Sequence, residues 1–295
     1  MAATAVPGQA PRTVTTRKRR RLTWSNVGLV LGVLLIAVYC LAPFYWMLVS
    51  SLKAPTDIFN NDLWPSNMSF ENFRAVFGSK NNFGYALRNS LIIASVATLL
   101  GMTIGIFTAY ALARLQFRGK FFVLGAVLAT AMFPGVAIVT PLFQLFSDIG
   151  WIDQYQAMII PDISFTLPLA IWILTSFFAE MPWELEQAAK IDGCTSGQAF
   201  RHVILPLAAP GVFTAAILVF IYAWNEYLIA SQVSQTLASE PVTVAIAKFT
   251  GSSQFQQPFG TQMAAGVVVT IPLVIMVLLF QRRIVAGLTA GGVKG

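Results

Sequence analysis

The side chains best suited to chemistry lie at the end of an uncharged apolar stretch, next to aromatic rings. Tyr222, Glu226 and Ile229 share one face of an expected helix, and Trp224 lies nearly opposite. A carboxylate can accept hydrogen bonds from hydroxyl groups, and the flat face of a sugar ring can lie on an aromatic side chain. We therefore expect Tyr222, Asn225 and Glu226 to contact a hydroxyl-rich solute. A polar contact with a neighbouring subunit explains them equally well.

Asp162 is the second acidic residue that lies within or beside an expected membrane span. It follows Pro161 near one end of its apolar stretch. A charge at the centre of a bilayer costs about 2.5–3.5 kcal/mol, so such a residue usually faces a protein interior or a watery cavity. Because Asp162 lies near the end of its span, we expect an interfacial or helix-capping role.

The chain lacks the motifs of the common enzyme classes. His202 is its single histidine, which excludes an H-E-x-x-H metal site. The pair Gly119-Lys120 is followed by Phe121 and lacks the earlier glycine of a phosphate-binding loop. Its two cysteines form neither a disulfide framework nor a metal site. We therefore expect no enzyme activity and no cofactor in this chain, and any ATP hydrolysis must occur on a partner.

Composition indicates a membrane protein. Of the 295 residues, 56% are hydrophobic and only 11% are charged, and the mean hydropathy is +0.69. A soluble domain carries about 25% charged residues, and a disordered chain is poor in hydrophobic ones. About 20 apolar residues cross a bilayer as a helix. We predict an all-α polytopic protein with six transmembrane helices, at 27–52, 89–113, 121–147, 154–179, 203–225 and 249–281.

The positive charges predict the orientation of these spans. A basic cluster at 17–21 precedes the first span, and most of the 19 Lys and Arg residues fall in segments on the same side of the membrane. Cytoplasmic segments carry such an excess, so we expect both termini in the cytoplasm. The first apolar run is too long for a cleaved signal peptide. The net charge of +7 is explained by this orientation signal, and we expect no nucleic-acid partner.

The loop at 180–203, between the fourth and fifth spans, is expected to form two short helices on the cytoplasmic side. Pro182 suits the first turn of the first helix, and Gly193 suits the left-handed position that ends it. Thr195 and Gln198 have the spacing of a capping box for the second helix, which Pro206 should limit. The loop is an ordinary connector, or it is a smooth surface that another protein contacts.

The loop resembles the EAA loop of ATP-binding-cassette (ABC) importer permeases. The resemblance rests on the string at 187–193, Gln-Ala-Ala-Lys-Ile-Asp-Gly, and on Ile204-Leu205-Pro206 at the family's spacing. One departure is that Gln187 replaces the family's usual glutamate, with Glu186 one step earlier, so a salt bridge at that point is in doubt. The resemblance implies a loop that couples to an ATPase, through Glu186, Gln187, Ala188, Ala189, Asp192 and Gly193.

Other strings are similar to the carbohydrate-uptake branch of that family, the MalG type. These are Asn89-Ser90-Leu91-Ile92, the segment 109–114, Trp224-Asn225-Glu226 and the tail at 287–295. Together with residues 249–255, the tail looks most like that of actinobacterial trehalose-importer permeases. In that family the tail reaches into the interface of the ATPase dimer.

The resemblance implies a type I ABC importer permease in the plasma membrane of a bacterium. Its parts would be a basic cytoplasmic segment at 1–26, a permease domain at 27–283 and a cytoplasmic tail at 284–295. It would form half of a translocation pathway for a disaccharide, with trehalose as the expected sugar. The implied partners are a second permease subunit, an ATPase dimer that binds ATP and magnesium, an extracytoplasmic sugar-binding protein and membrane lipid. The alternative is a self-contained secondary transporter or channel for a small polar solute.

Overall fold

The computed structural model describes residues 24–249 and 258–290, with side chains for 27–249 and 258–281. In this part every regular element is a helix, and one isolated bridge joins Lys53 to Met68. The chain divides after Trp46 into two units, which we describe separately. Nearly all of the predicted basic segment, most of the string at 249–255 and the last residues of the tail lie outside the described residues.

Within the described residues, four helices are long and apolar enough to cross a membrane. They are α1 (Trp24–Leu52), α3 (Phe83–Arg114), α6 (Gln156–Glu180) and α13 (Phe259–Ala290). They confirm helices at the first, second, fourth and sixth predicted spans, because long uncharged runs have no other stable form in lipid. Since α13 continues to Ala290, the start of the predicted tail at 284–290 is helical as well.

The third and fifth predicted spans are bent, so the structure has six spans only if each bent pair counts as one. The segment 121–147 is not one helix: α4 (Lys120–Thr130) and α5 (Gly135–Asp148) meet at 86°. Pro134 lies at this break in an extended conformation (ψ 116°), and a proline cannot continue the hydrogen-bond ladder of a helix. The fifth span is α10 (Ala209–Asn225), which meets the helical segment before it at 74°.

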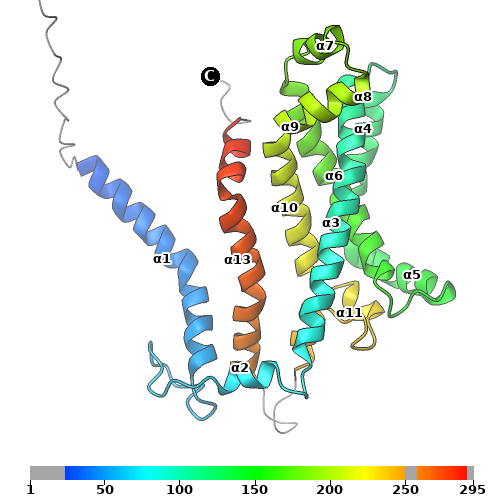
Figure 1. Cartoon of the computed structure of the whole chain (residues 1–295). Coiled ribbons are helices and arrows are strands. Elements are labelled where there is room, and N and C mark those ends of the chain that lie inside the picture. The colour runs from blue at the N-terminus through cyan, green and yellow to red at the C-terminus, as the bar shows by residue number, and fades with distance from the viewer. Residues whose placement is uncertain (1–23, 250–257, 291–295) are drawn as a thin grey trace, which may run out of the picture. The chain divides into compact units, whose positions relative to one another are not determined.

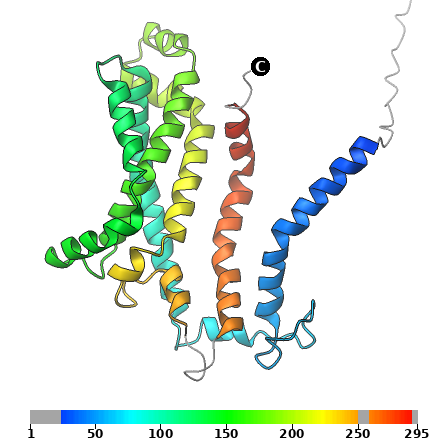
Figure 2. The ribbon, with the colours of Figure 1, turned by 180° about the vertical axis from the view of Figure 1, so that it is seen from behind.

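The second unit is a bundle in which α3 packs along α6, and α10 packs against α3, α6 and α13. Figures 1 and 2 show short helices at both ends of this bundle, with α7 at one end and α2 and α11 at the other. Small residues let α3 and α6 approach closely, since Gly105 of α3 faces Ala170 and Leu174 of α6. The short helices are α2 (Glu71–Val76), α7 (Glu184–Ile191), α8 (Ser196–Ala199), a π-helix at Phe200–Ile204, α9 (Leu205–Leu207), α11 (Ala230–Val233) and α12 (Val242–Ala247).

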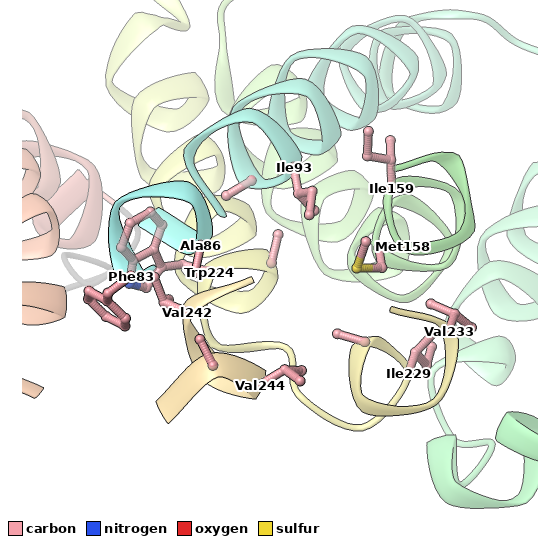
Figure 3. Packing of buried hydrophobic residues seen from close by; sticks show 14 of the residues in the cluster. Phe83, Ala86, Ile93, Met158, Ile159, Trp224, Ile229, Val233, Val242 and Val244 are labelled. Atoms are coloured by element: carbon pink, nitrogen blue, oxygen red, sulfur yellow. The ribbon is translucent and has the colours of Figure 1, made fainter. Parts of the chain in front are cut away.

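A hydrophobic cluster closes the end of the bundle that carries α11 and α12 (Figure 3). Trp224 of α10 is almost completely buried, as are Phe83 of α3 and Met158 of α6. Val233 of α11 and Val242 at the start of α12 complete the cluster. Two short helices thus become part of the core, although neither is long enough to be stable alone.

The segment after α10 is fixed to the bundle in its described part, which runs to Phe249. Asp153, in the loop before α6, accepts hydrogen bonds from the backbone N–H groups of Gln235 and Thr236 (3.0 and 2.9 Å) and from the hydroxyls of Thr236 and Ser239. Burial raises the pKa of Asp153, but these hydrogen bonds outweigh it and hold the pKa below its ordinary value.

Two residues of the Asn-Ser string on α3 hold the same segment. Asn89 donates to the carbonyls of Leu237 and Glu240 (3.1 and 3.0 Å), and the hydroxyl of Ser90 accepts from the N–H of Val242 (2.9 Å). Both side chains are buried. The string that resembles the sugar permeases therefore has a structural role here, which is to attach the segment after α10 to α3.

Replacing Gly211 with alanine should destabilise the bundle, because a Cβ there would lie 2.4–2.7 Å from ring atoms of Phe177 on α6. Overpacking of this kind costs about 1–3 kcal/mol. Gly105→Ala is the matched control, since its added Cβ would make only ordinary contacts at 3.6–3.9 Å. We expect a lower thermal unfolding temperature in detergent for Gly211→Ala alone. Equal temperatures for the two variants would contradict the close α6–α10 contact.

Candidate functional site

The loop helix α7 ends where the sequence predicts, but it begins later than expected. Pro182 is not in its first turn, because Trp183 is the N-cap and Glu184 is the first helical residue. Gly193 follows the end of the helix with φ +93°. This left-handed conformation is the one for which a glycine is favoured at a helix end. The capping box is also confirmed, because Gln198 N–H donates to the Thr195 hydroxyl and Thr195 N–H donates to the Gln198 side chain.

The second loop helix does not stop at Pro206, as the sequence analysis expected. After α8 the chain continues through a π-helix at Phe200–Ile204 and through α9, and it turns into α10 only at Ala208. Proline has no N–H to bond the carbonyl four residues earlier. The N–H of Leu205 bonds instead to the carbonyl of Phe200, five residues back, so a wider turn accommodates the proline without ending the helix.

The six residues assigned to the coupling loop do not share one face. Glu186 and Ala189 are buried, 4% and 7% exposed, and face the bundle. Gln187, Ala188, Asp192 and Gly193 are exposed. The position at which the family's glutamate is replaced therefore points outward, and Glu186 points inward, where it accepts a hydrogen bond from Lys190 (2.9 Å).

Two apolar residues of the loop were missed by the sequence analysis. Ile191 is 85% exposed and Leu185 is 37% exposed, on a helix whose other exposed residues are polar or small. Exposed apolar side chains next to small ones are typical of a surface that another protein covers. The sequence could have indicated them, because they are apolar residues in a polar loop that lies outside every predicted membrane span. The outer surface of the loop therefore comprises Leu185, Gln187, Ala188, Ile191, Asp192 and Gly193.

The three residues expected to contact a solute do line one pocket. Tyr222, Asn225 and Glu226 surround a cavity of about 430 Å³, together with Phe165 of α6 and Tyr227. The helical arrangement assumed from the sequence is wrong beyond Asn225, because α10 ends there and Glu226 has extended backbone angles. The chain then turns back over the pocket, so the residues meet through this turn and not along one helix face.

Glu226 stabilises that turn. Its two carboxylate oxygens accept hydrogen bonds from the backbone N–H groups of Ile229 and Ala230, at 2.8 and 2.9 Å. Its backbone carbonyl accepts from the hydroxyl of Thr243 (2.7 Å). Each carboxylate oxygen has a second lone pair, so Glu226 can hold the turn and still accept a hydroxyl from the pocket. Asn225, in contrast, donates to the carbonyl of Ile221 in its own helix (2.7 Å).

Asp162 does not cap a helix, contrary to the expectation from the sequence. It lies in the second turn of α6 and is 1% exposed, and neither carboxyl oxygen has a hydrogen-bond partner among the described residues. It interacts electrostatically with Tyr222 and Glu226 of the pocket. Sequence position near the end of a span suggested contact with water, but three packed helices enclose the side chain.

No metal site is found in the described part of the chain, where no three His, Cys, Asp or Glu side chains come together. The site therefore consists of an exposed loop surface at one end of the bundle and a pocket of polar and aromatic side chains toward the other. Hydrogen bonding and stacking are the interactions that this pocket can offer to a ligand.

Comparison with known proteins gives consistent relatives. Residues 101–289 match the family described as binding-protein-dependent transport system inner membrane component. The chain is 49% identical to the trehalose transport system permease protein SugB of Mycobacterium tuberculosis, over 94% of this chain and 99% of that one. It is 41% identical to the trehalose/maltose transport system permease protein MalG of Thermococcus litoralis, over 90% of this chain and 96% of that one.

Solved structures agree on the fold. A chain of a bacterial ABC transporter for import of the acidic polysaccharide alginate superimposes with a TM-score of 0.74 at 22% identity, covering 88% of this chain and 98% of that one. A chain of the alginate transporter in complex with a pentasaccharide-bound periplasmic protein superimposes with a TM-score of 0.63 at 18% identity, over 88% of this chain and 96% of that one. At these identities the likeness shows the fold alone.

Proposed function

This chain belongs to the family of inner membrane components of binding-protein-dependent transport systems, and we propose that it is the permease subunit of an ATP-driven importer of trehalose. The observation that carries the sugar assignment is the 49% identity to a trehalose permease over nearly the full length of both chains. The second relative transports trehalose and maltose, which makes maltose the next candidate. The chain would form half of the translocation pathway, together with a second permease subunit.

The exposed surface of α7 is the proposed contact with the ATPase. It combines small residues, Ala188 and Gly193, with the apolar Leu185 and Ile191. A partner groove could cover such a surface closely, because the small residues allow close approach and the two apolar side chains can be buried in the groove. ATP and magnesium would be bound by a pair of ATPase subunits, since this chain has no phosphate-binding loop.

ATP binding would drive transport by closing the ATPase pair. Closure would draw the two loop helices together, and the movement would pass into α6 and α10, which flank the loop. The pocket around Tyr222 would then open toward the other side of the membrane. ATP can shift this equilibrium only because it binds the closed ATPase dimer better than the open one.

The pocket at Tyr222, Asn225 and Glu226 is the proposed substrate contact of this subunit. Phe165 and Tyr227 supply rings, and Glu226 supplies hydrogen-bond acceptors. A neutral disaccharide needs both kinds of group. An extracytoplasmic binding protein would deliver the sugar, as supported by the alginate transporter that was solved with a periplasmic protein bound.

Reconstitution in vesicles tests the proposal. The complete complex, with ATP inside the vesicles and a trehalose-loaded binding protein outside, should accumulate labelled trehalose, and it should accumulate maltose more slowly. This chain alone should accumulate neither sugar, because it has no means to use ATP. Sustained accumulation by this chain alone would instead support a self-contained transporter or channel. Uptake of neither sugar by an active complex would reject the substrate assignment.

A further inference from the structure

The junction between α6 and the loop helix is held by a residue from a third helix, α3. Arg114 is the last residue of α3 and is only 6% exposed. Its Nη2 atom donates to the carbonyl oxygen of Met181 (3.0 Å), the residue that ends α6. Its guanidinium also lies over the ring of Trp183, 5.1 Å from the centroid, directly before α7. One side chain therefore contacts both sides of the turn that joins α6 to α7.

A second contact lies one turn earlier on α3. Tyr110 lies beside the buried carboxylate of Glu186 on α7. Its ring packs at 5.8 Å from that of Phe178 on α6 and at 4.6 Å from that of Phe200, the first residue of the π-helix. The end of α3 therefore contacts the loop in three places: before α7, at Glu186 within α7, and at Phe200 after α8.

Arg114 does more than mark the orientation of the membrane span. An arginine that marks the cytoplasmic side can extend into water, as exposed Arg118 does four residues later. Arg114 is buried, and its Nε atom and Oε2 of Glu186 both lack a hydrogen-bond partner among the described residues. Burying such groups away from water costs free energy. The structure therefore holds the Arg114 side chain in this position at the expense of its contact with water.

Taken with the proposed function, on which this inference rests, the geometry points to Arg114 as a positioning residue that fastens the loop helix to α3. A displacement of α7 by the ATPase then moves α3 together with α6 and α10, and the three helices turn as one body. Trp183 is the partner of Arg114 on the loop, because the guanidinium packs against the face of its ring.

The test uses the reconstituted complex and measures trehalose accumulated per ATP hydrolysed. Arg114→Lys keeps the charge but loses the planar fork that bonds a carbonyl and stacks on a ring. We expect Arg114→Lys and Trp183→Leu each to lower this ratio about 5- to 20-fold, with the complex assembled and ATP still hydrolysed. Trp183→Phe keeps an aromatic ring and should restore most of the ratio.

Arg118→Lys is the matched control, in the same cytoplasmic segment and exposed, and its ratio should stay within about twofold of wild type. If Arg114→Lys behaves like Arg118→Lys, the charge alone matters and the inference is wrong. Failure of the complex to assemble in Arg114→Lys, while Trp183→Leu transports normally, overturns it too. If the wild-type complex shows no ATP-driven uptake, the proposed function fails instead, and this separates the two failures.

Discussion

Gly193→Trp should nearly abolish ATP-driven uptake while the complex still reaches the membrane. Gly193 has φ +93°, and a Cβ built there would meet no other atom within 4 Å. An indole at this position therefore projects from the loop surface toward the proposed ATPase, where it separates the two proteins. We expect uptake to fall about 10- to 100-fold, as when a coupling free energy of about 1–3 kcal/mol is lost. Uptake by whole cells and the amount of complex in the membrane are the two measurements.

The control for Gly193→Trp must separate bulk from backbone strain, because any side chain other than glycine is disfavoured at a positive φ. Asparagine tolerates this conformation better than most residues and adds little volume. Gly193→Asn should therefore keep most of the uptake. If both variants lose uptake equally, the backbone of the turn is the cause and the docking surface is not supported. Wild-type uptake in Gly193→Trp would count against coupling through this loop.

Features that depend on neighbouring residues could be predicted from the sequence. The turn at Gly193 and the capping box at Thr195 and Gln198 follow from the preferences of a few consecutive residues, and the structure confirms both. The four long helices follow in the same way, because an uncharged run in lipid must satisfy its own backbone. The family resemblance also rested on local strings, and the comparison with known proteins confirms it.

Features that depend on distant parts of the chain could not be predicted. The hydrogen bonds from Asn89 to Leu237 and Glu240 span about 150 residues in sequence, so nothing local indicated that the segment after α10 is fixed. The burial of Asp162 depends on how α3, α6 and α10 pack around it. The same limit applies to Arg114, whose partners at Met181 and Trp183 lie almost 70 residues later.

Removing the carboxylate of Glu226 should have the largest effect on the pocket, because this group holds the turn that closes it. Glu226→Ala would leave the N–H groups of Ile229 and Ala230 without their acceptors. Each unpaired buried group costs about 1–3 kcal/mol, so we expect the turn to open and little complex to accumulate. The amount of complex in the membrane and its thermal unfolding temperature measure this effect.

Glu226→Gln separates the structural role of this residue from its proposed contact with the sugar. Glutamine keeps one oxygen as an acceptor but presents an NH₂ group where the second N–H needs an acceptor, so it should destabilise the turn by less than alanine does. We expect the glutamine variant to assemble and to transport trehalose at a reduced maximal rate. Asn225→Ala is the matched control, since Asn225 lines the same pocket but donates its hydrogen bond to a carbonyl of its own helix. It should assemble as the wild type does. Wild-type transport by Glu226→Gln would leave Glu226 with the structural role alone, because the turn would then tolerate the amide and the sugar would not need the second acceptor.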